Sequence, residues 1–245
     1  MKYSKLTIEN PNFLKRFSHQ SRFIEASKLL EQYRSVKEIS LLDFGSGDGY
    51  FIKFLIDRKF SFNFNAYDAD PEGKQINEMK RLFKNNKINN VSIFNQFQKI
   101  NKKFDIITCL ETLEHFNEKD QYKLINQMKS LLEENGRIII SVPIEVYLSG
   151  FVKMIFRFLV NQNHENTNIF NLFKTLFGVR IIENKKNTFL PTKDMQYRST
   201  HVGFYYFNLI KLIKRMGFKI EKIKFSPFPI LKSLLNSQIL LKIKN

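Results

Sequence analysis

The stretch ISLLDFGSGDG at residues 39–49 places three glycines directly after a short apolar run. An apolar run of this length is typical of a buried strand, and YFIKFLIDRKF at residues 50–60 has the composition of a helix. Glycine is needed between them because such a turn demands a positive φ and because a ligand must approach the backbone closely. The stretch therefore predicts a strand, a tight glycine turn and a helix, with a ligand at the turn.

Two acids accompany this turn in the sequence. Asp43 stands two residues before the first glycine, and residue 50 is Tyr, so the spacing differs from the G-x-G-x-x-G pattern of dinucleotide-binding proteins. A carboxylate beside the loop repels a pyrophosphate and attracts a cationic ligand end. Asp68 follows about twenty residues later, where a ribose-binding acid is expected because a carboxylate accepts two hydrogen bonds from a vicinal diol. The pattern favours a nucleoside that carries an amino acid over NAD.

Strand-like and helix-like segments alternate on both sides of this unit. A helical pattern over 23–34 precedes it, and further helices are predicted over 71–86 and 119–132. Apolar runs typical of strands occupy residues 62–70, 91–95, 104–110 and 136–143. Strands that are separated by helices predict a parallel sheet with helices on both faces.

The alternation stops at residue 144. Residues 144–200 are predicted to form a helical insertion or cap within a single domain that spans residues 1–245. Two helix-like pieces, 148–160 and 169–177, combine Phe with basic residues, and Lys153 and Arg157 fall four apart on one face. Two interpretations are open: an interfacial cap that meets anionic lipid or encloses an apolar acceptor, or ordinary helices packed on the sheet. A helix over 204–216 and strands at 218–225 and 238–245 then close the chain.

The composition sets the broad class. The chain has 245 residues, of which 43% are hydrophobic, enough for one buried core. Cys109 is the single cysteine, so no internal disulfide can form and a reducing cytoplasm is the expected compartment. Basic residues interrupt each apolar run before it reaches bilayer length, and the first residues do not resemble a signal peptide. We expect a cytoplasmic protein, with a position peripheral to the inner face of a membrane left open.

The positive charge is concentrated near the C-terminus. The whole chain has a formal net charge of +17, and residues 148–245 contain 17 basic and 4 acidic side chains, or +13. A uniform compositional drift would spread evenly, so this excess indicates an anionic partner such as phosphate, acidic lipid or nucleic acid. A solvated basic surface without a partner is the alternative.

Several motifs together resemble the class I S-adenosylmethionine-dependent methyltransferases, in particular the small-molecule and quinone-pathway O-methyltransferases. They are LLDFGSGDG at 41–49, AYDAD at 66–70, FDIITCLETLEHF at 104–116 and HVGFYYFNLIKLIKRMGFKI at 201–220. The resemblance covers about residues 20–145. It implies an α/β fold with a doubly wound, Rossmann-like sheet of seven strands, mostly parallel with a C-terminal antiparallel strand.

The resemblance also implies S-adenosylmethionine as the cofactor and assigns residues to it. Asp43, Gly45 and Gly47 would hold the methionine part and Asp68 the ribose. The adenine edge would meet Asn95 or Gln96, and the remaining members of the implied cofactor set are Ser46, Ala69 and Leu110.

Three polar residues follow the fourth predicted strand at positions i, i+3 and i+4. A helical turn would group Glu111, Glu114 and His115 at the ligand edge of the sheet. They are interpreted either as ligands of a divalent cation, as the resemblance implies, or as catalytic groups with His115 as general base and Glu111 beside it. The third interpretation is that Glu114 and His115 only cap and position the loop. His201, before the last predicted helix, is the other candidate base or a structural histidine.

The acceptor atom is predicted from a missing motif. Methylation of exocyclic amines usually comes with an Asn/Asp-Pro-Pro-aromatic tetrad, and residues 109–112 read Cys-Leu-Glu-Thr instead, which favours oxygen. The sequence thus predicts an O-methyltransferase for a small-molecule or lipid-linked acceptor, including a glycan precursor. An RNA-directed enzyme ranks lower, because the basic residues alternate with Phe at helical spacing and not as a stacking platform. A non-catalytic nucleoside-binding module is the other alternative.

Overall fold

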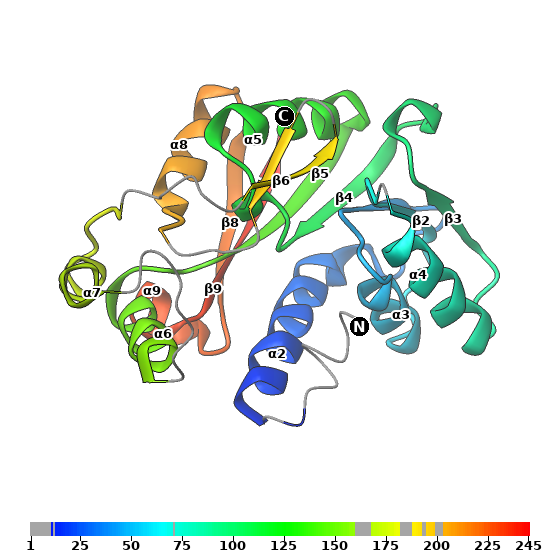
Figure 1. Cartoon of the computed structure of the whole chain (residues 1–245). Helices are drawn as coiled ribbons and strands as arrows, with labels where there is room; N and C mark the ends of the chain where they lie inside the picture. The colour runs from blue at the N-terminus through cyan, green and yellow to red at the C-terminus, as the bar shows by residue number, and fades with distance from the viewer. Residues whose placement is uncertain are drawn as a thin grey trace.

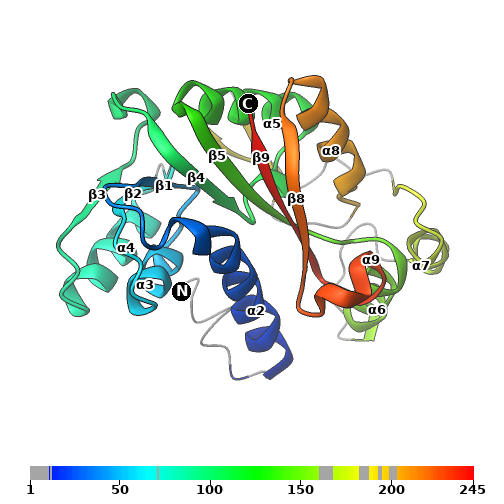
Figure 2. The same cartoon turned by 180° about the vertical axis from the view of Figure 1, so that it is seen from behind.

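The computed structural model describes residues 11, 13–70, 72–159, 168–181, 188–192, 195–198 and 203–245. A central sheet with helices on both faces dominates this part of the chain (Figures 1 and 2). A second sheet of two strands lies outside it.

The central sheet contains seven strands in the order β3-β2-β1-β4-β5-β9-β8. The strand β9 runs antiparallel to both of its neighbours, and the other pairings are parallel. The strand bounds are β1 Ser40–Phe44, β2 Asn63–Tyr67, β3 Val91–Phe94, β4 Phe104–Leu110, β5 Leu132–Pro143, β8 Lys219–Ser226 and β9 Gln238–Lys244. The predicted α/β, Rossmann-like sheet with its C-terminal antiparallel strand is confirmed.

The order of the strands reverses beside β1. The chain passes from β1 to β2 and β3 on one side, and then returns to place β4 on the other side of β1. Open α/β sheets bind ligands outside the carboxyl ends of the strands at such a reversal. The glycine turn that follows β1 lies at this position.

Helices cover both faces of the sheet. One face is covered by α2 (Phe13–Leu30), α3 (Tyr50–Asp57) and α4 (Lys74–Asn85), and the other by α5 (Glu118–Ser130) and α8 (Tyr206–Arg215). Successive strand residues enter opposite cores: Leu41 and Ile106 pack with the first helix layer, and Leu42 and Ile107 with the second. The central strands are mostly apolar because both of their faces are buried.

The segment between β5 and α8 contains helices and a hairpin. Its helices are α6 (Tyr147–Leu159) and α7 (Ile169–Leu176), which match the predicted 148–160 and 169–177. The strands β6 (Thr188–Thr192) and β7 (Met195–Arg198) pair antiparallel, so residues 144–200 are not purely helical. A 3₁₀ turn, η4 (Pro229–Leu231), and the short α9 (Lys232–Leu235) join β8 to β9 next to α6.

Lys153 contacts the strand ends next to α6. Its ammonium Nζ donates to the carbonyl oxygens of Ile144 (2.9 Å) and Ser237 (3.1 Å) and pairs with Glu145 Oε1 at 3.1 Å. Of the two interpretations left open for this helix, packing on the sheet applies at Lys153, because its ammonium satisfies three acceptors just after β5 and just before β9. The side chain of Arg157 lies outside the described residues.

In the part of the chain that the structure describes, no helix combines the length and the apolar character needed to cross a bilayer.

Candidate cofactor and acceptor site

The three glycines of the turn have different surroundings. All three have positive φ: +77° at Gly45, +55° at Gly47 and +77° at Gly49. A Cβ at Gly45 would lie 2.3 Å from Thr112 Oγ1, and one at Gly49 would lie 2.7 Å from Met79 Cγ. At Gly47 nothing lies within 4 Å of that position. The lack of a side chain at Gly45 and Gly49 thus makes room for Thr112 and Met79. Gly47 instead faces the open space that a ligand requires.

Asp68 lies at the carboxyl end of β2, directly against this turn. The Gly47 amide donates to Asp68 Oδ2 at 2.7 Å, and the Asp68 amide donates to the Phe94 carbonyl oxygen at 3.2 Å. Burial raises the pKa of Asp68 to about 6, against the lowering effect of the Gly47 hydrogen bond, and the charge of Asp70 raises it further. The predicted ribose acid is therefore adjacent to the glycine of this turn that faces open space.

Asp70, the second acid of the AYDAD motif, has a separate role. Its Oδ2 accepts hydrogen bonds from the amides of Gln75 (2.5 Å) and Ile76 (3.1 Å) in the first turn of α4. These bonds satisfy amides that have no partner within the helix, so Asp70 stabilises the start of α4.

Asp43 is buried beneath the glycine turn. Its carboxylate accepts hydrogen bonds from the hydroxyls of Ser46 (2.8 Å) and Thr108 (2.7 Å). Burial raises the pKa of Asp43 to about 6, and these hydrogen bonds and the charge of Arg22 act in the opposite direction. Asp43 therefore ties the turn to β4 and places a titratable charge below it.

Glu111 follows β4 in a left-handed conformation, with φ of +53°. Its Oε2 lies 3.2 Å from Arg22 Nη1, and both side chains are buried, at 10% and 2% exposure. Ser141 Oγ donates to its Oε1 at 3.4 Å. Burial raises the pKa of Glu111, while Arg22 and Lys153 oppose that rise. The carboxylate is held by an ion pair, an arrangement that suits a positioning role.

The predicted divalent-cation site is not supported. Among the residues that the structure describes, no group of three His, Cys, Asp or Glu side chains is placed to hold a metal ion. The expected helical turn starts only after Glu111, as the 3₁₀ turn η3 (Leu113–His115), so Glu111, Glu114 and His115 do not share a face. Glu111 is turned to Arg22, and Glu114 is buried with a pKa raised well above its usual value, first by burial and then by the charge of Glu111.

His115 is held by the hairpin of the insertion. Its ring stacks on Tyr197 of β7, with centroids 4.5 Å apart and planes 19° from parallel. Phe116 forms a backbone bridge with Tyr197 and meets its ring edge-on at 5.8 Å. The loop after β4 and the insertion thus meet at this imidazole. His201, the other predicted base, lies outside the described residues.

The other predicted cofactor residues lie along the same edge. Asn95 and Gln96 follow β3 directly and are exposed. Ala69 is half-buried and packs against the core, whereas Leu110 is buried at the end of β4. Ser46 is buried and bonded to Asp43.

Two residues of this region are absent from the sequence interpretation. Tyr197 carries no local signal, because its partner His115 comes from a distant part of the chain. Arg22 left a weak one: it precedes Ala26 by four residues and Leu29 by seven, so it shares the buried face of α2. A basic residue within an apolar helical stripe indicates a buried ion pair.

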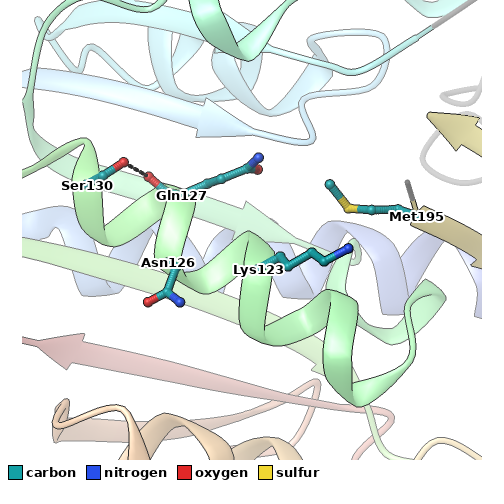
Figure 3. Close-up of a pocket in the computed structure, with 5 residues that line it drawn as sticks. All are labelled: Lys123, Asn126, Gln127, Ser130 and Met195. Carbon is teal, nitrogen blue, oxygen red and sulfur yellow. Dashed lines mark hydrogen bonds between the residues drawn. The ribbon is translucent and has the colours of Figure 1, made fainter. Parts of the chain in front are cut away.

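A separate open pocket lies between α5 and β7 (Figure 3), with a volume of about 650 Å³. Lys123 and Gln127 extend from α5 toward Met195 of the hairpin. The other lining residues are Asn126 and Ser130. Among the residues that the structure describes, no predicted cofactor or catalytic residue lines this pocket.

Solved structures with a similar fold include several methyltransferases. The PH0226 protein from Pyrococcus horikoshii OT3 is 16% identical, with a TM-score of 0.61 over 99% of this chain and 96% of that one. Magnesium protoporphyrin IX methyltransferase from Synechocystis PCC 6803, solved with bound S-adenosylhomocysteine, is 13% identical, with a TM-score of 0.57 over 96% and 89%. An S-adenosylmethionine-dependent methyltransferase from Clostridium acetobutylicum is 17% identical, with a TM-score of 0.57 over 99% and 95%. At these identities the likeness establishes the fold.

One curated protein is similar in sequence. The uncharacterized protein MJ0638 of Methanocaldococcus jannaschii is 30% identical over 145 residues, which are 57% of this chain and 58% of that protein. The chain therefore matches less than two thirds of that relative's length.

The family assignment comes from the sequence model of a family described as "Methyltransferase domain". It matches residues 17–223, a range that includes the glycine turn, Asp68, the loop after β4 and the hairpin of the insertion. The chain therefore belongs to the methyltransferase-domain family.

Proposed function

We propose that this methyltransferase transfers the methyl group to an oxygen atom of a small-molecule or lipid-linked acceptor, such as a glycan-precursor sugar or a quinone. The observation that supports this proposal is the His115 imidazole, fixed against Tyr197 in the loop that follows β4. A positioned imidazole accepts the proton of a hydroxyl near neutral pH. An amine acceptor is less suited to this loop, which has no Pro-Pro-aromatic tetrad.

The residues at the glycine turn fit the cofactor. Gly47 leaves room for a ligand against the backbone, and Asp68 beside it has the carboxylate that a ribose diol needs. We assign the methionine end to the turn residues 45–47, with the charge of Asp43 below them, and the adenine edge to Asn95 or Gln96. Ala69 and Leu110 complete the assigned set. When bound, S-adenosylmethionine supplies an electrophilic methyl group.

The chain's own residues then have three tasks. The turn and Asp68 hold the cofactor, and the segment with α6, α7 and the hairpin selects the acceptor. His115 would take the acceptor's hydroxyl proton as the methyl group passes from the cofactor's sulfur to the acceptor oxygen, which leaves S-adenosylhomocysteine. We place Glu111 as a positioning residue that holds α2 to the loop through Arg22. His201 remains a predicted second base.

Cofactor affinity should fall as the pH is lowered. Asp43 and Asp68 have pKa values of about 6, and both bind the cofactor best as carboxylates. Between about pH 8 and about pH 5 we expect the Kd for S-adenosylhomocysteine to rise about tenfold if one carboxylate must be ionised and about 100-fold if both must. Titration calorimetry across this range measures the change.

The same pKa shifts exclude acid unfolding driven by Asp43 or Asp68 as the cause of weaker cofactor binding at low pH. A carboxyl whose pKa is raised in the folded state favours the folded protein when it is protonated, so acidification through pH 6 does not destabilise the fold through Asp43 or Asp68. Asp68→Asn, which cannot titrate, should bind weakly with a shallower pH profile. If the Kd of the parent protein does not change with pH, neither carboxylate belongs to the binding site.

The acceptor proposal predicts a defined loss of turnover in His115→Phe. The phenyl ring keeps the stack on Tyr197 but cannot take a proton, so kcat should fall by about 10²–10⁴-fold while the Kd for S-adenosylhomocysteine stays unchanged. The assay follows methyl label from S-adenosylmethionine into phenols, a hydroquinone and an isoprenoid-linked sugar. Tyr197→Phe, which retains the ring, is the matched control and should keep full turnover.

The product distinguishes the alternatives. A labelled methyl ether or methyl ester of one of these compounds supports the proposal. Label that enters only RNA, with binding that weakens steeply as salt rises, would identify the RNA-directed enzyme in its place. Cofactor binding with no transfer to any acceptor would indicate the non-catalytic module.

We also propose a cytoplasmic location, peripheral to the inner face of a membrane. Cys109, the single cysteine, is fully buried, which suits a protein that needs no disulfide. The net charge of +13 in residues 148–245 favours contact with anionic headgroups.

A further inference from the structure

The helix α7 exposes its aromatic side chains and buries two of its polar side chains. Its four most exposed side chains, which include Phe177 at its C-terminal end, are Ile169 (71%), Phe170 (67%), Phe173 (54%) and Phe177 (75%). Successive helical residues are about 100° apart, so these four lie within a single stripe about 100° wide. A helix of a globular protein normally turns such a stripe toward the core.

The opposite side of α7 is polar and buried. Asn171 is 9% exposed and Thr175 is fully buried. A Cβ at Gly150 of α6 would lie 2.6 Å from Thr175 Cγ2, so the small residues Gly150 and Thr175 bring the two helices close together. Thr175 Oγ1 donates to the Asn171 carbonyl oxygen at 2.8 Å, which satisfies its hydroxyl within the helix. Close packing through small residues fixes the aromatic stripe on the outside.

Further contacts keep this orientation. Asn168 Oδ1 accepts the Asn171 amide at 2.8 Å and caps the start of α7. Leu172 packs with the buried Met154 of α6 and Ile181 in a small apolar cluster of its own. The cap turns with the helix, but this cluster depends on the present rotation of α7, so the exposed stripe is built into the fold.

Exposed apolar side chains also occur on the neighbouring elements. Val152 of α6 is 55% exposed, and Ile230 and Leu231 of η4 are 93% and 41% exposed. Both views show α6, α7 and α9 together at the end of the sheet where β5 leads into α6 (Figures 1 and 2). The cap face is defined here as the exposed stripe of α7, which consists of Ile169, Phe170, Phe173 and Phe177.

The described charges of the elements around the cap face are basic. Lys174 Nζ lies 4.5 Å from the centre of the Phe170 ring, Arg180 follows three residues after Phe177 and is exposed, and Lys232 of α9 is exposed. From residue 148 onward, the described residues include one acid, Glu221, which lies in the first half of β8 and is paired with Arg137 at 2.7 Å. The aromatic stripe thus has a cation against it, and the described residues of α6, α7, η4 and α9 include no acid.

We propose that the cap face docks onto the surface of an anionic lipid bilayer, with its aromatic rings at the acyl boundary and its cations at the headgroups. Apolar rings on one side of a helix with basic residues beside them are the pattern of interfacial helices. A second copy of the chain would oppose the same cations and would repel. The proposal deepens the membrane-peripheral location proposed above, and it does not depend on methyl transfer.

Vesicle flotation tests the proposal with the full chain. The protein should float with phosphatidylcholine vesicles that contain about one quarter phosphatidylglycerol, and at least about tenfold less with phosphatidylcholine alone. Phe170→Ser combined with Phe173→Ser and Phe177→Ser should lower partition into the anionic vesicles by at least about tenfold. Lys174→Glu with Arg180→Glu should also lower partition into the anionic vesicles and should make this partition depend less on salt.

Matched variants separate docking from loss of folding or of charge. Val36→Ser with Tyr122→Ser removes two exposed apolar residues outside the cap face, and Lys211→Glu with Lys214→Glu makes the same charge change on α8. Both controls should float like the parent, and circular dichroism should show an unchanged fold throughout.

Three results would overturn the proposal. They are absence of flotation by the parent protein, equal losses in the cap-face and control variants, and a dimer in sedimentation that the three serine substitutions dissociate. The last would identify a second copy as the occupant of the cap face. Cofactor binding, measured separately on the same variants, should be unchanged, so failure of docking would leave the proposed methyl transfer untouched.

Discussion

Gly47→Val will weaken the binding of S-adenosylhomocysteine by at least about 100-fold, which corresponds to about 2.7 kcal/mol. The new Cβ and its two methyl groups would occupy the open space beside the turn, where nothing of the protein lies within 4 Å. That space borders Asp68, whose carboxylate accepts the Gly47 amide at 2.7 Å. Titration calorimetry with the purified variant measures the loss.

Backbone strain requires a control of its own. Gly47 has φ of +55°, and a β-branched residue held there costs about 1–3 kcal/mol of stability. Gly217 after α8 has φ of +86° and likewise nothing within 4 Å of its Cβ position. Gly217→Val therefore imposes comparable strain in the turn between α8 and β8. It should lose similar stability and bind the cofactor normally.

The comparison between these two variants decides the location of the cofactor. If Gly47→Val binds S-adenosylhomocysteine as tightly as Gly217→Val does, the space at the turn is not where the cofactor lies. Gly47→Ala should give an intermediate loss, because it adds a single carbon to the same space.

Arg22→Met will destabilise the folded protein by about 3–5 kcal/mol. Arg22 is 2% exposed and is paired at 3.2 Å with Glu111, so methionine fills most of the volume but leaves a buried carboxylate without its cation. Burial already raises the pKa of Glu111, and Arg22 opposes this rise. The unfolding free energy from urea denaturation measures the loss.

The pH dependence identifies the charge as the cause. Without Arg22 the pKa of Glu111 rises further, and a carboxyl with a raised folded-state pKa destabilises the fold as the pH increases through it. The destabilisation should therefore be larger at about pH 8 than at about pH 5. A loss that is equal at both values would point to packing and not to the ion pair.

An exposed pair in the same chain provides the matched control. Arg34 pairs with Glu31 at 2.9 Å, but their side chains are 38% and 56% exposed. Arg34→Met should cost less than about 1 kcal/mol, because solvent screens such pairs. Glu111→Gln in the Arg22→Met background should recover most of the larger loss, since it removes the stranded charge.

Local sequence patterns predicted much of the fold. The apolar runs and the helical spacing predicted the positions of α4, α5, α7 and α8 and of the strands of the central sheet to within a few residues, because each pattern lies within a single element. The glycine turn and Asp68 were equally visible, since a ligand-binding turn needs residue types at fixed short spacings. The helical spacing of Glu111 and His115 misled, because Glu111 adopts a left-handed conformation before η3 begins.

The amphipathic patterns of the insertion show a second limit of periodicity. Spacing identified the aromatic stripe of α7 but not the direction in which it points. The close approach of Gly150 to Thr175 turns the stripe outward, and three acceptors turn Lys153 inward. A pattern defines the two faces of a helix, whereas the neighbouring elements decide which one is buried.

By itself, the sequence determined the doubly wound sheet, the glycine turn and the acid at the end of β2, because these depend on residue type and short spacing along the chain. Tertiary structure alone decided that Arg22 neutralises Glu111, that Tyr197 holds His115 and that Gly47 is the glycine beside open space. Each of these depends on residues that are distant in sequence and are brought together by the packing of helices and loops around the sheet. Burial and pairing are properties of that packed arrangement, and they set the charges of the site.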